Sequence, residues 1–77
     1  MTRGGVGSGM RQMHITLNGE PRDMPERMTL HGLLEELKLT PDKVAIELNR
    51  RLVRSEKYGE ALREGDVVEI VTFVGGG

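Results

Sequence analysis

The stretch Val67-Val68-Glu69-Ile70-Val71-Thr72-Phe73-Val74 is the most continuously apolar part of this sequence, and three glycines, Gly75-Gly76-Gly77, follow it directly. A run of this kind, rich in β-branched residues, is typical of a buried strand with neighbours on both sides. We therefore predict that it forms the central strand of a sheet. The extended glycines would carry the carboxylate of Gly77 roughly 10 Å beyond the fold, which suits insertion into the active site of a partner enzyme.

Length, charge and composition limit the possible classes of function. The chain has 77 residues, which is enough for one small domain. It contains no cysteine, so disulfides and thiolate metal sites are excluded. Its 11 basic and 12 acidic residues give a net charge of −1, which predicts neither nucleic acid nor a membrane surface as a partner. Without a long apolar stretch or a secretory signal pattern, we expect a soluble protein of the cytoplasm.

The character of the sequence changes after residue 12. Residues 1–12 contain four glycines and no periodic pattern, so we expect a disordered extension that is either native or left from cloning. Residues 13–74 carry the regular patterns of a folded domain. Residues 75–77 are expected to form a flexible tail.

Two adjoining segments at the start of the domain predict a β-hairpin. Residues 13–17 alternate between apolar and polar, which is the period of a half-buried strand. Asn18-Gly19 follows, and this pair favours a type I′ turn, in which both central residues have positive φ. The return strand, about residues 20–24, is polar and contains Pro21, so we place it at the edge of the sheet.

A helix is predicted between residues 29 and 40. Four leucines recur at the spacing of one helical face: Leu30, Leu33, Leu34 and Leu37. Thr29 is suited to cap the amino end of this helix. Thr40-Pro41 should end the helix, because proline disfavours the helical conformation of the residue before it.

The remaining pattern predicts two further strands. Residues 44–48 alternate as a strand, and residues 49–51 turn the chain into the apolar pair 52–53, a short edge strand. Residues 55–62 are expected to be a loop with a short helical turn, and residues 64–66 a tight turn. One leucine-faced helix can cover one face of such a sheet, so the predicted fold class is α+β in two layers.

The ordered set of motifs resembles the ubiquitin-like β-grasp sulfur carriers. It comprises the Asn18-Gly19 hairpin, the leucine-faced helix, Val44-Ala45-Ile46-Glu47-Leu48-Asn49, Glu64-Gly65-Asp66-Val67-Val68-Glu69-Ile70 and Val74-Gly75-Gly76-Gly77. The resemblance covers Met13 to Gly77 and, within that group, is strongest to the ThiS family of thiamine thiazole synthesis. It implies a β-grasp domain whose mixed sheet of four to five strands packs on one main helix.

The same resemblance implies a chemistry for the last residues. A ThiF-like adenylating enzyme would use ATP to convert the carboxylate of Gly77 to an acyl-adenylate, and sulfur would displace AMP to give a thiocarboxylate. Gly76 would pass the narrow channel of that enzyme, and Gly75 would add reach. Sulfur would come from a donor such as a cysteine desulfurase system and go to a ThiG-like thiazole synthase. The chain offers no nucleophile–base pair, so it is expected to be a co-substrate without a bound cofactor and not an enzyme.

Four residues are candidates for docking a partner. Phe73 and Val74 would either form an apolar patch on the sheet face opposite the helix or pack against neighbouring strands. Arg50 and Arg51 belong to a local basic cluster, which is either solvated turn charge or a docking edge. Met24 and Met28 leave a similar choice open, between core packing and an adaptable apolar surface.

Two histidines could suggest a metal or a base. His14 and His31 lack carboxylate or thiolate neighbours at a metal-ligand spacing. We expect one on the polar face of the first strand and the other near the start of the helix. No metal site is predicted.

Two other functions fit parts of the pattern. The small subunit of molybdopterin synthase shares the fold, the Gly-Gly end and the thiocarboxylate chemistry that the resemblance implies. A β-grasp binding module, similar to a TGS domain, would need no free carboxyl end. The slightly acidic balance of charge argues against RNA binding by such a module.

Overall fold

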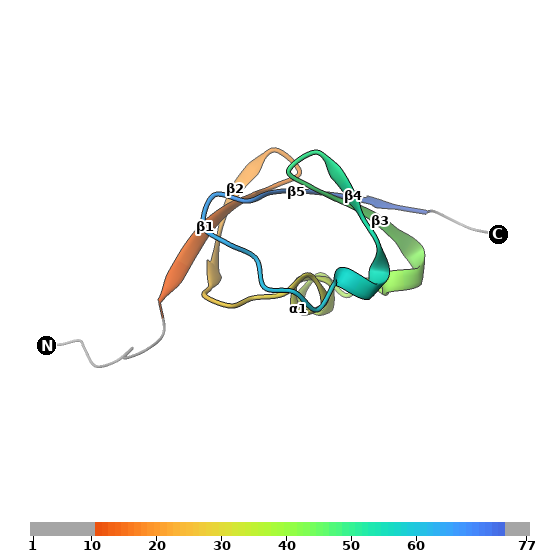
Figure 1. The fold of residues 1–77 in the computed structure, drawn as a ribbon, viewed down its shortest axis with the longest axis horizontal. Coiled ribbons are helices and arrows are strands. Elements are labelled where there is room, and N and C mark those ends of the chain that lie inside the picture. Colours follow the sequence, from red (N-terminus) through yellow and green to blue (C-terminus); the bar gives the residue numbers. More distant parts are fainter. Residues whose placement is uncertain (1–10, 74–77) are drawn as a thin grey trace, which may run out of the picture.

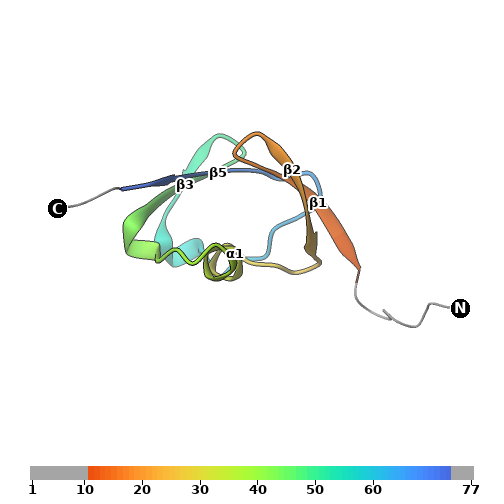
Figure 2. The same cartoon turned by 180° about the vertical axis from the view of Figure 1, so that it is seen from behind.

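Five strands and one α-helix make up the part of the chain that the structure, a computed structural model, describes, residues 11–73 (Figure 1). The strands form one mixed sheet in the order β2-β1-β5-β3-β4. The helix α1 lies across one face of this sheet, as both views show (Figures 1 and 2). The predicted two-layer α+β fold is therefore confirmed.

The first hairpin forms as predicted. β1 (Gln12–Leu17) pairs antiparallel with β2 (Glu20–Pro25), and the turn residues Asn18 and Gly19 have φ values of 51° and 84°. Positive φ at both positions is what a type I′ turn requires. β2 forms one edge of the sheet, where Pro21 is tolerated because a proline there removes no hydrogen bond to a second neighbouring strand.

A second two-residue turn joins β3 (Val44–Leu48) to β4 (Arg51–Val53). Asn49 and Arg50 form this turn, with φ values of 53° and 72°. The turn is one residue shorter than predicted, because Arg51 belongs to β4 and pairs with Leu48 across the hairpin. β4 forms the other edge of the sheet, as expected.

β5 (Val67–Thr72) is the central strand, as predicted. It runs parallel to β1 and antiparallel to β3. The expectation of a buried strand is wrong for one face, because Val67 and Val71 are 36% and 60% exposed while Val68 and Ile70 lie in the core. An apolar run by itself does not distinguish a strand covered on both faces from a strand covered on one.

The ends of the domain differ slightly from the boundaries drawn from the sequence. β1 starts at Gln12, and the carbonyl of Arg11 accepts a hydrogen bond from the N–H of Glu26 at 2.8 Å, so both residues belong to the hairpin. β5 ends at Thr72, earlier than the predicted end at Val74. Val74 and the three glycines after it lie outside the described residues.

α1 (Leu30–Glu36) begins where the sequence predicts. The Oγ1 atom of Thr29 accepts a hydrogen bond from the N–H of Gly32 at 3.0 Å, so Thr29 is the N-cap. Leu30, Leu33 and Leu34 are buried beneath the sheet, and the fourth leucine of the predicted face is partly buried against them.

The helix ends before Thr40-Pro41, which corrects the predicted stop. Lys38, with φ of 61°, lies in the left-handed region just after the helix. The N–H of Leu39 donates to the carbonyl of Leu34 at 2.9 Å, and the N–H of Lys38 donates to the carbonyl of Glu35 at 3.1 Å. These two bonds define a Schellman motif, in which Lys38 occupies the position that glycine usually takes.

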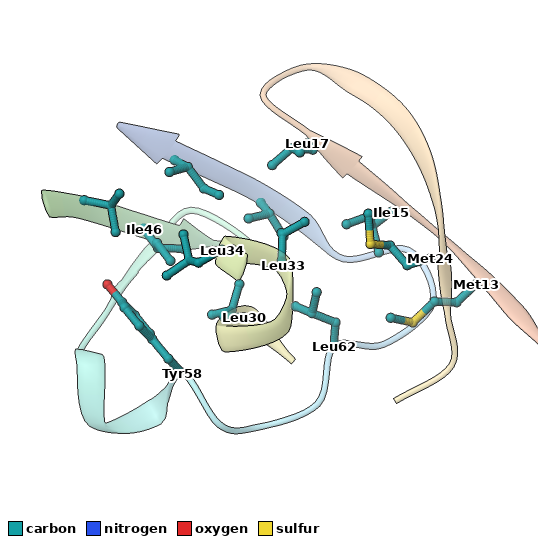
Figure 3. Packing of buried hydrophobic residues seen from close by; sticks show 13 residues of the cluster. Met13, Ile15, Leu17, Met24, Leu30, Leu33, Leu34, Ile46, Tyr58 and Leu62 are labelled. Carbon is teal, nitrogen blue, oxygen red and sulfur yellow. The ribbon is translucent and has the colours of Figure 1, made fainter. Parts of the chain in front are cut away.

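The core lies between α1 and the sheet and contains thirteen buried apolar side chains, which Figure 3 shows as sticks. They are Met13, Ile15, Leu17, Met24, Leu30, Leu33, Leu34, Val44, Ile46, Tyr58, Leu62, Val68 and Ile70. Met24 is 2% exposed and Met28 packs partly buried against the cluster, so both methionines serve the core.

The segment after β4 contributes more to the core than its sequence predicts. The expected short helical turn is present, as a 3₁₀ turn at Ser55–Lys57. Tyr58 and Leu62 follow it and are 3% and 4% exposed. The carbonyl of Tyr58 accepts a hydrogen bond from the N–H of His31 at 2.9 Å, and the N–H of Leu62 donates to the carbonyl of Met28 at 2.7 Å. This segment therefore closes the side of the core next to the start of α1.

Candidate docking surface along the last strand

The tips of both hairpins contact β5, the strand that leads into residues 74–77 (Figure 1): the turn between β3 and β4 contacts its first residue, and the turn between β1 and β2 contacts its middle. On one side, the Oδ1 atom of Asn49 accepts a hydrogen bond from the N–H of Val67 at 2.9 Å. On the other side, the Oδ1 atom of Asn18 accepts a hydrogen bond from the N–H of Ile70 at 2.8 Å. Two turn asparagines therefore fix β5 between the hairpins.

The sheet face opposite α1, which we call the outer face, exposes apolar side chains along β5. Val71 is 60% exposed, and Phe73, which falls on the same side by the alternation of the strand, is 57% exposed. The N–H of Phe73 donates a hydrogen bond to the carbonyl of Lys43 at 2.8 Å, so its backbone is held against the start of β3. Of the two expectations for Phe73, the structure supports the exposed position.

Two glutamates lie opposite each other on the outer face. Glu47 of β3 pairs with Glu69 of β5, and both side chains are exposed. Glu47 also faces Leu52 of β4, which is 71% exposed. Sequence reasoning missed this pair because its members are distant in the chain, and only the register of β3 against β5 brings them together.

The expected basic docking residues lie at the other end of β5. Arg51 pairs with Leu48, which itself pairs with Val68, so Arg50 and Arg51 are near the start of β5. Phe73 follows the opposite end of that strand. Along β5 it is five residues from Val68, which corresponds to about 17 Å at roughly 3.3 Å per residue. The structure therefore does not bring Arg50 and Arg51 together with Phe73.

The basic cluster instead lines an open groove. Arg51, Arg54 and Lys57 border it, between β4 and the segment that carries Leu62. The Nζ atom of Lys57 lies 3.6 Å from Oε2 of Glu60, and both side chains are largely exposed. These charges are exposed, which is compatible with both sequence-based interpretations, solvated turn charge and a docking edge.

His14 forms the shortest side-chain contact of the first hairpin. Its Nδ1 atom lies 2.6 Å from Oδ1 of Asp23 on the neighbouring strand, and its backbone N–H donates to Oε1 of Glu64 at 2.9 Å. The hydrogen bond to Asp23 and the charges of Asp23 and Glu64 raise the pKa of His14 above 6.5. The side chain is exposed, so water screens these effects.

His14 and His31 are both exposed, as predicted. Within residues 11–73 no group of three or more His, Asp and Glu side chains is placed to hold a metal ion. The same residues contain no helix with the length and apolar character needed to cross a membrane. Gly75, Gly76, Gly77 and Val74, which the sequence marks as candidates, lie outside this range.

Residues 15–77 match the sequence model of the ThiS family. The chain belongs to the ThiS family. The matched range includes the strand β5, the outer-face glutamates and the terminal glycines. The resemblance drawn from the motifs is therefore confirmed.

Members of this family and longer proteins are both similar to the chain. It is 42% identical over 64 residues to the sulfur carrier protein ThiS of Thermus thermophilus, which covers 82% of this chain and 98% of that protein. It is 47% identical over 66 residues to the thiazole synthase of Magnetococcus marinus, which covers 84% of this chain and 20% of that protein. The chain thus spans about a fifth of the length of the thiazole synthases that it matches.

A solved structure has the same fold. The thiamine biosynthesis protein ThiS of Geobacter metallireducens superimposes with a TM-score of 0.69 at 33% identity, covering 84% of this chain and all of that protein. The predicted ubiquitin-like β-grasp fold is therefore confirmed. That solved protein is named for thiamine biosynthesis, and two of the longer similar proteins are named thiazole synthases.

Proposed function

We propose that this chain is a sulfur carrier of thiamine biosynthesis that receives sulfur on the carboxyl group of Gly77 and delivers it for thiazole formation. One observation carries the proposal: the match to the ThiS family runs through Gly75-Gly76-Gly77. A relative of similar length, aligned over 98% of itself, is named a sulfur carrier protein. On this basis the chain is a carried co-substrate and not a catalyst.

The chemistry requires activation by another protein. A carboxylate is a poor electrophile, so one oxygen of Gly77 first attacks the α-phosphorus of ATP on an adenylating enzyme, and pyrophosphate leaves. The acyl-adenylate then has a good leaving group. A sulfide equivalent supplied by a sulfur donor attacks the acyl carbon, AMP leaves, and the product is a thiocarboxylate. ATP is bound by the partner, and this chain supplies the acyl group.

The three glycines suit this role because they have no side chains. An enzyme that encloses the acyl group must let the preceding backbone pass through a narrow channel, and glycine offers the smallest cross-section. Gly76 would lie in that channel, and Gly75 would extend the reach from β5.

Thiazole synthase is the proposed acceptor of the sulfur. Two thiazole synthases contain a segment similar to this chain that makes up a fifth of their length. A domain of this kind thus occurs within polypeptides of that name. The presence of both segments in one polypeptide supports direct transfer of sulfur from this chain to a separate thiazole synthase.

The proposal is tested by reconstitution. We expect the chain, incubated with the adenylating enzyme, ATP and a sulfide source, to gain the mass of one oxygen-to-sulfur exchange. Tandem mass spectrometry should locate the exchange on Gly77. The proposed function would be refuted if the mass of this chain stayed unchanged with an adenylating enzyme that loads another ThiS-family carrier under the same conditions.

Gly76→Val tests the narrow channel. We expect this variant to lose pyrophosphate exchange, because a β-branched side chain cannot pass where glycine does. Gly59→Val is the matched control, since a Cβ atom at Gly59 would meet nothing within 4 Å. The control should be activated at the normal rate. Equal activation of both variants would contradict the channel.

One residue appended after Gly77 separates a carrier from a binding module. A carrier loses adenylation altogether, because the reacting carboxyl then belongs to another residue. A binding module of the TGS type would keep its affinity. The measurement is pyrophosphate exchange beside a thermal unfolding curve, which reports whether the domain still folds.

A further inference from the structure

The two edges of the sheet, β2 and β4, differ in what they offer to another strand. In an antiparallel pair, residues that exchange backbone hydrogen bonds alternate with residues whose N–H and C=O groups point away from the partner strand. The two residues that flank a two-residue turn form a hydrogen-bonded pair. Counting from each turn therefore shows which backbone groups face the open side of each edge strand.

The edge at β2 is closed to a further strand. Leu17 and Glu20 flank the first turn, so the backbone of residues 21, 23 and 25 points away from β1. Two of these residues, Pro21 and Pro25, have no N–H group, and the third is the acidic residue Asp23. Proline and charge at such positions are common means of protecting a sheet edge from pairing.

The edge at β4 is open. Leu48 and Arg51 flank the second turn, so the N–H and C=O groups of Leu52 point away from β3. Arg54 still has an extended backbone, with φ of −80° and ψ of 152°, so its N–H faces the same side. Within residues 11–73, no segment outside this hairpin forms a hydrogen bond with the backbone of Leu52. The edge therefore offers two donors and one acceptor to an added strand.

The groove beneath β4 has an apolar floor on the helix side of this edge. Leu30, Leu48, Val53 and Leu62 line it. Val53 pairs with the fully buried Ile46, so its side chain lies on the helix side of the sheet. Leu30 and Leu62 are 2% and 4% exposed, so the floor belongs to the core. An apolar side chain of an added strand would rest on this floor.

Positive charge borders the groove. Arg51, Arg54 and Lys57 are all exposed and line it, together with one acidic residue, Glu60. Three cations and one carboxylate leave an excess of two positive charges, although the whole chain has a net charge of −1. In the described part of the chain, neither arginine forms an ion pair, whereas Lys57 lies 3.6 Å from Glu60. Such a local excess attracts an acidic ligand.

The open backbone selects a peptide from among the acidic ligands. A peptide strand carries both N–H and C=O groups, so it pairs with the donors and with the acceptor of the β4 edge. The phosphate diesters of a nucleic acid only accept hydrogen bonds and leave the carbonyl of Leu52 without a partner. The amino-terminal segment of this chain is not the complement, because residues 1–10 contain one arginine and no acidic residue.

We propose that the open edge of β4 and the groove beneath it bind an extended acidic segment of a partner protein, which joins the sheet as a sixth strand. Alternate side chains of this segment face the groove. One apolar side chain rests on the floor, and the carboxylates on either side of it meet Arg51 and Arg54. Backbone bonds supply affinity and the charges supply selectivity. The proposal does not depend on the chemistry of Gly77, so the carrier function and this surface can fail separately.

The first test is an NMR titration of the unmodified chain with a capped peptide, Glu-Thr-Val-Thr-Glu-Thr, whose glutamates and valine share one face when extended. We expect the amide signals of Leu52 and Arg54 to shift, and the amide signal of Asp23 on β2 to stay. At low salt the Kd should be about tenfold smaller than that of Gln-Thr-Val-Thr-Gln-Thr, and the difference should shrink as salt is added.

The second test removes the charges from the groove. We expect Arg51→Gln/Arg54→Gln to increase the Kd of the acidic peptide about tenfold, to the value of the glutamine peptide. The matched control is Arg11→Gln/Arg22→Gln, which removes the same charge from exposed residues of the first hairpin, at the other side of the sheet. This control should bind the acidic peptide with the Kd of the unmodified chain.

The third test removes backbone donors from the peptide and leaves the protein unchanged. The N–H groups of neighbouring residues in a strand point to opposite sides, so only one of two adjacent N–H groups faces β4. Of two acidic peptides, one methylated on the nitrogen of valine and the other on the nitrogen of the following threonine, we expect one to lose binding and the other to keep it.

The results that would overturn the proposal are distinct. Equal Kd values for the acidic and glutamine peptides, or for the two double variants, would exclude recognition of acidic side chains. Two methylated peptides that both bind like the parent would exclude strand addition. Shifts of Leu52 and Arg54 on concentrating the chain alone would make a second copy the occupant. A single-stranded RNA oligonucleotide that shifts these signals at lower concentrations than the peptide would exclude the choice of a peptide.

Discussion

The side chain of Asn18 bonds to the backbone of β5 at the point where β1 no longer pairs with it. β1 pairs with β5 at Thr16–Val67 and Leu17–Val68, and the chain then turns away into the hairpin. Beyond that point, the side chain of Asn18 accepts from the N–H of Ile70 at 2.8 Å and donates to its carbonyl at 3.3 Å. The backbone of the central strand is thus satisfied on this side by an amide side chain.

Substitution of Asn18 tests this role. Asn18→Gly keeps the positive φ of the turn and removes both hydrogen bonds, so we expect a loss of about 1–2 kcal/mol in the free energy of unfolding. Asn18→Asp keeps the acceptor for Ile70 and should lose less. Urea denaturation measures both values. A glycine variant as stable as the unmodified chain would show that water replaces the asparagine without cost.

His14 gives the domain a pH-dependent contact. Because its pKa is raised above 6.5 by Asp23, protonation favours the folded state. The contribution is fully present below pH 6.5 and is lost as the pH rises through the folded-state pKa. We expect an NMR titration to place the pKa of His14 above 6.5, and Asp23→Asn to lower it. An identical titration in the variant would rule out Asp23 as the cause.

At the scale of single elements, the end of the helix is one of the positions where a residue other than glycine has positive φ. Lys38 has φ of 61°, a region that costs a residue with a Cβ atom roughly 1–2 kcal/mol. The position suits glycine, which adopts this conformation freely.

Lys38→Gly should therefore stabilise the domain, by about 0.5–1 kcal/mol after the greater freedom of glycine in the unfolded chain is subtracted. Lys38→Ala keeps the strain and removes the charge near the helix end, so it should give no gain. The midpoints of urea unfolding of the two variants make the comparison. A gain from alanine equal to that from glycine would mean that charge, and not backbone strain, matters here.

The elements were predictable where a local signal defines them. Each of these signals lies within a few residues: Asn18-Gly19 predicts the hairpin turn, the four leucines predict the helix, and the alternation over residues 44–48 predicts a strand. The end of the helix was not predictable, because Pro41 is a well-known helix-ending residue whereas Lys38 is not. The Schellman hydrogen bonds nevertheless end the helix before the chain reaches Pro41. The burial of Tyr58 and Leu62 was missed because it depends on contacts with the start of α1, distant in the sequence.

At the scale of the whole molecule, the buried core of the described residues precedes the terminal glycines in the sequence. Within the described residues, the buried cluster ends in the sequence at Ile70. We therefore expect deletion of residues 75–77 to change the free energy of unfolding by less than about 0.5 kcal/mol, as for surface changes. The same deletion should abolish sulfur loading. A large loss of stability on urea denaturation would show that the glycines contribute to the fold.

The candidate site divides in the same way. Its covalent part, Gly77, came from a sequence motif and stays a prediction. For its docking part, the sequence left two positions open for Phe73, an exposed patch or packing against neighbouring strands, and the structure shows the side chain exposed. The opposed pair of glutamates on the outer face depends on the register between β3 and β5, which no local pattern states, and Arg50 and Arg51 were grouped with Phe73 although the register places them at opposite ends of β5.

β5 is synthesised after the other four strands but lies in the middle of the sheet, so the sheet cannot assemble before β5 has been made. Until β5 has left the ribosome, the two hairpins share no neighbour, and contacts such as that of Asn18 with Ile70 must close a separation of 52 positions. A prematurely terminated chain would expose both apolar hairpin faces to proteases. Under the proposed function, an adenylating enzyme would therefore act only on chains whose translation has passed β5.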